Sequence, residues 1–260
     1  MPTFSIDNKI IWRKESKIAI VENFYPSVYR EIIQKENFLK ENFKVEITTA
    51  NKEKLQRLFL PLYFQEVVSK ENFTLSKETI AADIEKKLNF NAYEFMFIYF
   101  QNKLIFAWLF CFKNKGLYMA YRAFNRNFDK TINHKAPISY WAEKLLFDYG
   151  KENNALFFSH GRDSHPYIGK SRIGLPLYKI KTGVRPGKPG LNETTLVEEV
   201  LTEKALKKIA PVLFFSDTDE NNFYKNCYLY FPKGSLDESY LKEFEKVMLW
   251  AGINFIPIAF

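Results

Sequence analysis

Cysteine is scarce in this sequence of 260 residues, which holds two, Cys111 and Cys227. Each lies inside or beside an apolar run, as expected of a small buried side chain, and they form no C-x-x-C pair. This pattern excludes a disulfide framework and a cysteine-rich zinc or redox site. Because disulfide-dependent proteins belong to oxidising compartments, we expect this protein in a reducing one, the cytoplasm.

Long apolar runs and blocks of like charge are also missing. No stretch approaches the roughly 20 apolar residues of a membrane-spanning helix, and the first residues do not resemble a signal peptide, so no membrane span is expected. Lys and Arg number 38 against 30 Asp and Glu, which gives a formal net charge of +8 spread along the chain. Such an excess attracts phosphates and nucleic acids, although a basic surface that only aids solubility explains it equally well.

Acidic and histidine clusters of the kind that bind metals are not apparent either. His160 and His165 stand close together without a nearby cysteine, which is not a zinc pattern, and we expect no metal. Asp217 and Asp219 are interpreted as solvated turn residues. What the chain does have is 47% apolar and 17% aromatic residues, enough for a large core or an aromatic-lined cleft.

The apolar pattern predicts an α/β (α+β) protein with a mixed, mainly antiparallel sheet flanked by helices. Three apolar runs with short polar breaks predict an antiparallel meander. In chain order we expect a hairpin-like start (Lys9–Trp12, Ser16–Glu22), a helix (Ser27–Asn42), a strand (Phe43–Thr48), a helix kinked at Pro61 (Asn51–Val68), a helix from Ser76 to Leu88, and the meander (Tyr93–Phe100, Lys103–Phe112, Gly116–Ala123).

A helix is predicted to begin at Pro137 and to end at Gly150, a residue typical of a C-terminal cap. It leads to a strand at Ala155–Ser159, and the order strand, helix, strand favours parallel pairing there. The remaining predicted elements are an edge strand (Leu177–Lys181), a Pro- and Gly-rich linker (184–192), a helix (Glu198–Ile209), strands (Val212–Phe215, Tyr228–Phe231), a helix (Asp237–Ala251) and a last strand (Asn254–Ile258). We therefore divide the chain into a domain of 1–183, the linker, and a smaller α/β part of 193–260.

The first candidate site is the start of the helix at Pro137. The first turn of a helix exposes unpaired N–H groups and a positive dipole end, which suit a phosphate. An ordinary solvated helix start is the alternative. The residues predicted to bind the phosphates of a cofactor are Arg122, Arg126, Lys135, Ala136, Ile138 and Ser139.

The second candidate site is the segment Ser159–Gly183, which follows a predicted strand end, where ligands of α/β sheets bind. His160 or Asp163 can act as a general base there. Tyr167, Lys170 and Arg172 are predicted to bind the acceptor substrate. A surface loop with solvated charges is the alternative.

The order of these elements resembles the GNAT acyltransferase core, and several motifs resemble its Fem-type peptidyltransferase, or FemAB-like (BioF-like), branch. The motifs are Tyr149-Gly150, Phe157–Gly161, Lys170–Gly174 and the closing L-Y-K-I-K-T-G of Leu177–Gly183. With the order of the elements, the resemblance covers about Phe43 to Gly183. By this resemblance Lys181, and second Lys179, would stabilise the oxyanion of acyl transfer. Two positions depart from the family: Ser159 replaces an Asp, and His134–Ser139 lacks the glycines of an acetyl-CoA pyrophosphate loop.

The resemblance implies an acyltransferase that moves an acyl group from acyl-CoA (such as acetyl-CoA) or aminoacyl-tRNA to an amine of a small molecule or peptide. The donor is expected in a slot between the strands Lys103–Phe112 and Gly116–Ala123, and the segment 193–260 would be a degenerate second GNAT copy. The alternative is a catalytically inactive GNAT-like module that binds an anionic ligand or RNA, which the missing glycines favour.

Overall fold

The computed structural model describes residues 3–15, 19, 21–68, 76–90, 92–125, 127–128, 137–189 and 198–260. The chain divides into two compact units, here called unit 2 (Ser27–Phe158) and unit 1 (Met1–Pro26 with Ser159–Phe260). The boundary that the sequence suggests at 184–192 stays a prediction. No helix among the described residues is long and apolar enough to cross a membrane.

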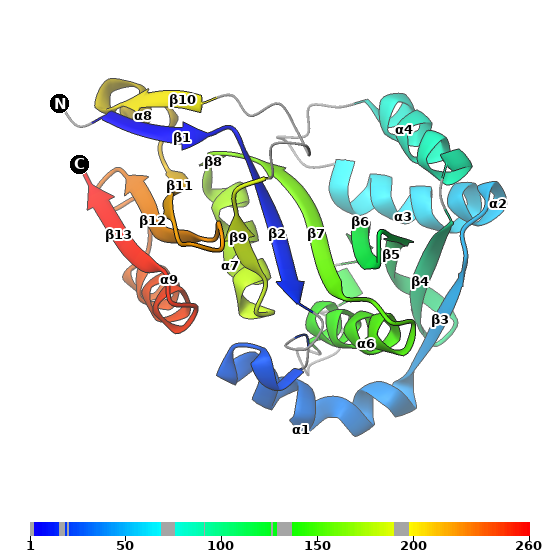
Figure 1. Cartoon of the computed structure of the whole chain (residues 1–260). Helices are drawn as coiled ribbons and strands as arrows, with labels where there is room; N and C mark the ends of the chain where they lie inside the picture. The colour runs from blue at the N-terminus through cyan, green and yellow to red at the C-terminus, as the bar shows by residue number, and fades with distance from the viewer. Residues whose placement is uncertain are drawn as a thin grey trace. The chain divides into compact units, whose positions relative to one another are not determined.

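Unit 2 contains the predicted meander. Its strands β3 (Phe43–Thr49), β4 (Tyr93–Phe100), β5 (Lys103–Lys113) and β6 (Gly116–Phe124) pair antiparallel in this order, as Figure 1 shows. Two-residue turns join β4 to β5 and β5 to β6. Their residues Gln101, Asn102, Asn114 and Lys115 all have φ between 46° and 63°, the conformation of the tight turns that match the twist of a hairpin.

Both faces of this sheet are covered, because alternate residues of each strand point to opposite sides. One face carries Phe95 and Leu109, which join the core formed with the helical segment 52–68 and α4 (Lys77–Phe90). The other face packs on α6 (Ile138–Glu152), where Tyr149 meets Phe110 at a ring distance of 5.8 Å. The helix α1 (Pro26–Asn42) precedes β3, and Phe38 of α1 contacts Phe43. Unit 2 is thus a helix–sheet–helix sandwich.

The segment around Pro61 is helical throughout, so the expected kink takes the form of a changed helix register. It runs as α2 (Lys52–Lys54), a π-helix (Leu55–Phe59), α3 (Leu60–Tyr63) and a second π-helix (Phe64–Val68). The N–H of Leu60 bonds to the carbonyl of Leu55, five residues back. Pro61 has no N–H to donate. In the wider π register, the carbonyl groups of the preceding turn accept hydrogen bonds from N–H groups five residues ahead.

The prediction that Gly150 caps α6 was wrong, since α6 continues to Glu152 and Asn153 is its C-terminal cap. Gly150 has a packing role instead. A Cβ placed there would lie 2.8 Å from Cζ of Phe158 and 3.1 Å from Cδ1 of Leu117. The sequence analysis took Gly150 for the end of the helix, although it lies inside it. Glycine is favoured both at the end of a helix and where an aromatic ring approaches the backbone closely, so the residue alone does not distinguish the two.

The described residues of unit 1 form three groups of strands. β7 (Phe157–Ser164), β2 (Lys9–Glu15) and β9 (Arg185–Gly187) are neighbours in that order. A second sheet has the order β13 (Asn254–Ala259), β12 (Tyr224–Phe231), β11 (Val212–Thr218), β8 (Tyr167–Ile168), and β1 (Thr3–Asp7) pairs with β10 (Glu198–Thr202). The helices are α7 (Lys170–Lys181), α8 (Glu203–Ile209) and α9 (Glu238–Trp250), with a short 3₁₀ turn at Val21–Asn23.

Two predicted elements of unit 1 were wrong. Leu177–Lys181 is the end of the helix α7, because Ile173, Leu177 and Ile180 recur at helical spacing and all three are buried. Residues 198–202 form the strand β10, and α8 starts only after Thr202, whose hydroxyl accepts from the N–H of Ala205 at 3.2 Å. In the predicted linker, Arg185–Gly187 pairs with β2. Of the expected N-terminal hairpin, 16–18 and 20 lie outside the described residues.

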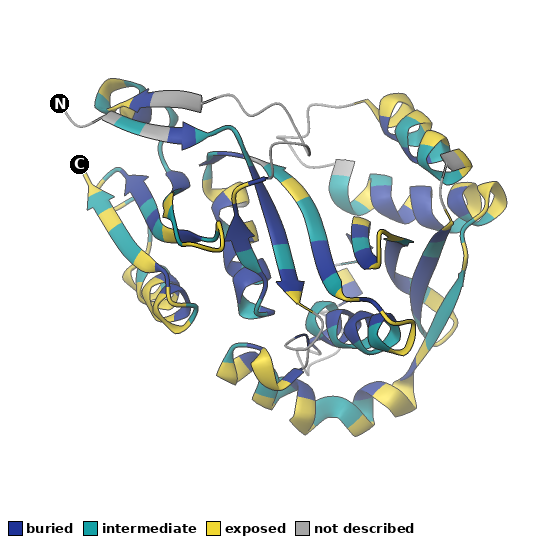
Figure 2. Cartoon of the chain, viewed as in Figure 1, coloured by how far each residue is buried: buried dark blue, intermediate teal, exposed yellow. Residues whose placement is uncertain are grey.

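The helix α9 shows how the apolar pattern positions these elements. Phe244, Val247 and Met248 are buried, whereas most other residues of the helix are exposed, as the dark blue and yellow along α9 show (Figure 2). Leu249, at its end, is 74% exposed and Trp250 38%.

The mixed, mainly antiparallel α/β class predicted from the sequence is confirmed.

Replacing Gly150 by Ala should destabilise the protein by ~1–3 kcal/mol, although Ala is the better helix former. The added Cβ would strike Phe158, which is fully buried against Phe147 at a ring distance of 4.7 Å. Gly174→Ala in α7 is the matched control, because its Cβ would meet only the hydroxyl of Tyr240 at 3.5 Å. Urea unfolding should show a loss for the first variant and none for the second. Equal stabilities would contradict this packing argument.

Candidate functional site

The predicted second site is the only one of the two whose residues the structure describes in full, and part of it forms a buried polar cluster in unit 1. Asp163 of β7 is at its centre. Its Oδ2 accepts hydrogen bonds from Nζ of Lys179 at 2.7 Å and from the hydroxyl of Tyr167 at 2.6 Å. The indole N–H of Trp12 donates to the same tyrosine oxygen at 3.0 Å. We call Trp12, Asp163, Tyr167 and Lys179 the Asp163 cluster.

Local structure explains why these four side chains meet. Successive residues of β2 face opposite sides, so Trp12 and Lys14 share the side that carries contacts to α7 and the turn after it. Lys179 lies in the last turn of α7, and its ammonium is 5.2 Å from the centroid of the Trp12 ring. Tyr167 belongs to β8 and is held by antiparallel pairing opposite Leu213.

The cluster is largely withdrawn from water, with side-chain exposures of 6% for Lys179 and 17% for Asp163. A buried charge is tolerated only when it is paired and hydrogen-bonded, and the ion pair meets this need for both partners. Burial, followed by the nearby Asp163 carboxylate, holds the pKa of Tyr167 well above its ordinary value. Tyr167 therefore remains protonated and donates to Asp163. Both hydrogen bonds are accepted by Oδ2 of Asp163.

His165 lies next to this cluster and has a structural role that the sequence analysis missed. Its Nε2 accepts from the backbone N–H of Phe215 at 2.8 Å, so the proton must be on Nδ1, which lies 2.6 Å from the carbonyl oxygen of Asp7. Burial lowers the pKa of His165 to about 4. The neutral ring thus joins the end of β1 to β11. The histidine selected from the sequence as a base was the half-buried His160 on β7.

The other predicted residues of this segment take different places. Lys181 forms an ion pair with Glu243 of α9, and its side chain is 14% exposed. Lys170 and Arg172 are exposed in the first turn of α7. The structure therefore brings Asp163, Tyr167 and Lys179 together, whereas Lys181 is engaged elsewhere. Their roles in catalysis or acceptor binding stay predictions.

Three of the predicted phosphate-binding residues are described by the structure, namely Arg122, Ile138 and Ser139, and all three belong to unit 2. The guanidinium of Arg122, on β6, lies 5.3 Å from the ring of Trp108. Ile138 is buried and Ser139 is half-buried in the first turn of α6. This turn is closed by the hydrogen bond from the N–H of Trp141 to the carbonyl oxygen of Pro137 at 2.8 Å. Arg126, Lys135 and Ala136 lie outside the described residues. Phosphate binding at this helix start stays a prediction.

The expected donor slot between β5 and β6 was wrong. These strands pair continuously from Lys113–Gly116 to Phe106–Phe124, with one irregularity between Leu109 and Phe110. The reason is their two-residue turn, which fixes the register from its first pair, so the strands have no freedom to separate. If a donor binds this protein, it does so elsewhere than between these two strands.

Acidic residues of the described chain serve local structure. Within the described ranges no three His, Cys, Asp or Glu side chains converge as a metal site would require. Asp217 accepts from Ser216 at 2.8 Å and from the amide of Asn226 at 2.7 Å, and Asp219 accepts from the backbone N–H groups of Asn221 and Phe223. The solvated turn expected at these residues is thus a hydrogen-bonded one.

Comparison with known proteins finds similarity at the level of structure. No family model matches the sequence, and no curated protein matches it. The crystal structure of FemX aligns with 77% of this chain at a TM-score of 0.52 and 12% identity. A conserved protein of unknown function from Bacteroides thetaiotaomicron aligns with 76% at 0.47 and 9% identity, and L-PGS from Bacillus licheniformis with 70% at 0.38 and 11% identity. The alignments span 63%, 61% and 53% of those chains.

Lowering the pH from 6.5 to 4 should remove ~3 kcal/mol of stability through His165 alone. Its folded pKa of about 4 lies below the ordinary 6.5, so in this window the unfolded chain binds a proton that the folded one does not. Stability therefore falls as the pH falls. His165→Gln keeps an acceptor for the N–H of Phe215 but removes the titration.

The measurement is urea unfolding of both proteins at several pH values between 4 and 7. The variant should be the less stable protein at pH 7 and should lose less stability on acidification. The comparison uses the slopes and not the absolute stabilities, because the substitution also removes packing. Parallel slopes would show that His165 does not carry this pH dependence.

Proposed function

We propose that this chain, which has the Fem-type GNAT fold, transfers an acyl or aminoacyl group to an amine acceptor. The observation that carries the proposal is the fold shared with FemX over 77% of the chain, which agrees with the motifs in the sequence that resemble Fem-type transferases. At 12% identity the likeness shows the fold, and the chain spans 63% of FemX, so the reaction is our inference. Acyl-CoA and aminoacyl-tRNA are the two donor classes we consider.

The Asp163 cluster is the part of the chain whose chemistry suits this reaction. An acceptor amine must lose a proton before its nitrogen attacks the acyl carbonyl, and a positioned carboxylate can accept that proton. Lys179 and Tyr167 fix Asp163 through Oδ2, which leaves Oδ1 in a defined direction. In the balanced reaction the C–N bond forms, the carbonyl bond to the donor sulfur or oxygen breaks, and the proton from the amine ends on that leaving atom.

A cation near the acyl carbonyl would stabilise the oxyanion of the tetrahedral intermediate. Lys181 is our candidate for this role, with His160 as an alternative base, and Tyr167, Lys170 and Arg172 as acceptor contacts. Lys181 would have to leave Glu243 to act, whereas Lys179 already neutralises Asp163. We therefore treat Lys179 as a positioning residue rather than as a catalytic one.

A second function is a GNAT-like module without catalysis that binds an anionic ligand or RNA. The specific observation that favours it is that both candidate catalytic lysines are in ion pairs, Lys179 with Asp163 and Lys181 with Glu243. The absence of glycine from residues 134–139 points the same way. RNA binding that weakens steeply with salt, without transfer of any acyl group, would support this function over the first.

A saturating donor should raise the melting temperature, because binding to the folded state alone stabilises it by about 2.7 kcal/mol at a concentration of 100 Kd. This corresponds to a shift of about 5–10 °C for a chain of this size. The measurement compares acetyl-CoA, a long-chain acyl-CoA and an aminoacyl-tRNA, each with its deacylated form. Absence of a shift with all three donors would count against the transferase.

Asp163→Asn should lower kcat/KM for the donor so identified by about 10²-fold or more, the usual contribution of a general base. Tyr167→Phe should cost less, because Lys179 still holds the carboxylate. Asp148→Asn is the matched control, since that carboxylate pairs with Lys144 on α6 in unit 2. Melting curves identify variants that lose activity by unfolding. Wild-type turnover in folded Asp163→Asn would exclude this residue as the base.

A further inference from the structure

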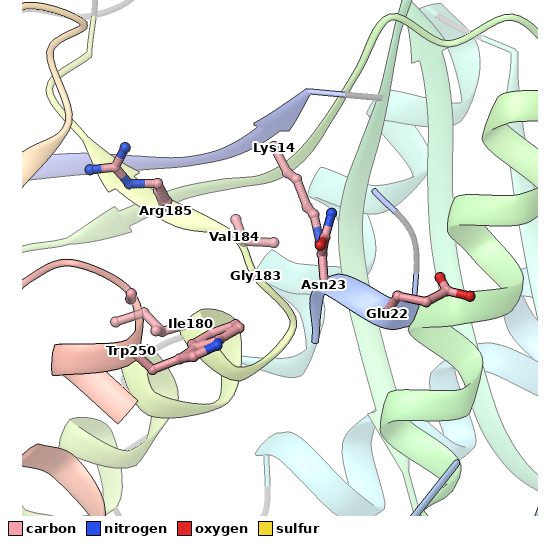
Figure 3. A pocket seen from close by; sticks show the side chains of 9 residues that line it. Lys14, Glu22, Asn23, Ile180, Gly183, Val184, Arg185 and Trp250 are labelled. Carbon is pink, nitrogen blue, oxygen red and sulfur yellow. The ribbon is translucent and has the colours of Figure 1, made fainter. Parts of the chain in front are cut away.

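Unit 1 contains a pocket of about 370 Å³ beside the C-terminal end of α7. This size falls within the range of about 300–1,000 Å³ typical of small-molecule sites. Among the residues that line it are Lys14, Asn23, Ile180, Gly183, Arg185 and Trp250, all of unit 1, and Figure 3 shows their arrangement. None of the four residues of the Asp163 cluster lines it.

Lys14 places a positive charge in the wall of this pocket. The residue is 3% exposed, and its ammonium donates to the carbonyl oxygen of Thr182 at 2.8 Å and lies 5.3 Å from the centroid of the Phe24 ring. Thr182 follows directly on α7, so the ammonium also faces the negative end of that helix. A cation held where water is scarce acts strongly on an anion that enters the pocket, because the local dielectric constant is low.

Gly183 keeps that ammonium at the wall. Its φ is +77°, and a Cβ at this position would lie 2.6 Å from Nζ of Lys14 and 2.6 Å from the backbone oxygen of Asn23. Any side chain here would displace the lysine or the turn. The glycine therefore permits a close approach of backbone and cation in the wall of the pocket.

Arg185 adds a second positive charge. Its guanidinium carbon lies 4.6 Å from the centroid of the Phe223 ring, and one terminal nitrogen is 3.4 Å from Oδ2 of Asp219. Nε is buried and has no hydrogen-bond partner among the described residues. The lining also includes Glu22, but its exposed side chain points away from Lys14 and Trp250 in Figure 3. The guanidinium of Arg185 also extends away from Lys14 in Figure 3 and is held by Asp219, so Lys14 is the charge that favours an anion in this pocket.

Trp250 supplies a flat apolar surface to the same pocket. Its ring is held edge-on by Tyr25 at 5.5 Å, yet the residue remains 38% exposed. Ile180 and Val184 provide further apolar lining. An indole held rigidly at a pocket beside a cation suits a ligand that combines a planar ring with an anionic group, because the ring can stack while the anion pairs.

We propose that this pocket binds a small organic anion with a planar ring, whose anionic group pairs with Lys14 and whose ring lies against Trp250. The inference goes beyond acyl transfer and does not depend on it. The experiment measures only binding to this pocket. A negative result therefore says nothing against the proposed transferase, and a failure of the transferase proposal says nothing against the pocket.

The test uses two probes of this class, adenosine 5′-monophosphate and 8-anilinonaphthalene-1-sulfonate, with the full chain in titration calorimetry. Each should bind with one-to-one stoichiometry and compete with the other. Adenosine, which lacks the anion, and inorganic phosphate, which lacks the ring, should each bind at least tenfold more weakly than the nucleotide. If neither probe binds below about 1 mM, or if adenosine binds as well as the nucleotide, the proposal is overturned.

Two variants locate the site. Lys14→Met removes the charge and Trp250→Ala the ring, and each should weaken both probes at least tenfold. Lys242→Met is the matched control, because this exposed lysine of α9 pairs with Glu238 outside the pocket, and it should bind as the wild type does. Since Lys14 is buried and its replacement can impair folding, Trp250→Ala decides the matter in that case. Unchanged binding in folded Trp250→Ala would overturn the proposal.

Discussion

The hydrogen bonds between Asp163 and the pair Lys179 and Tyr167 organise unit 1 around them. They connect β7 to the last turn of α7 and to β8, and through the indole of Trp12 they reach β2. Each partner depends on the others, because an unpaired charge or hydroxyl at such depth would cost several kcal/mol. One carboxylate therefore helps to hold the last turn of α7 in place, next to the turn at Gly183 against which Lys14 packs.

The elements that could be predicted are those whose pattern has one explanation. The three strands of the meander follow from apolar runs separated by the short polar breaks Gln101–Asn102 and Lys113–Lys115, which are typical of tight turns between antiparallel strands. Leu177–Lys181 failed for the opposite reason: in L-Y-K-I-K apolar residues alternate with polar ones as in a strand, and the helical periodicity becomes visible only when Ile173 is included. Short alternating segments do not determine their own secondary structure.

The candidate site was predictable in part, and the reason lies in the range of its interactions. Asp163 and Tyr167 were selected because they fall within one polar segment that follows a strand, and Lys179 was selected from the resemblance to Fem-type transferases. Trp12 is more than 150 residues away in sequence from Tyr167, and Lys14 is 168 from Thr182, so no local pattern connects them. His165 was missed because its two hydrogen bonds join backbone groups of Asp7 and Phe215, which carry no side-chain signature.

The ion pair also constrains how this chain can act on a substrate. A lysine that neutralises a buried aspartate cannot stabilise an oxyanion without leaving the aspartate unpaired, and the cost of that step is comparable to the benefit of the new contact. In the transfer that we propose, the carboxylate of Asp163 is therefore a better candidate for catalysis than Lys179, because it can accept a proton while Oδ2 keeps both donors. We place anion recognition at Lys14, whose charge lines a pocket, rather than at Lys179.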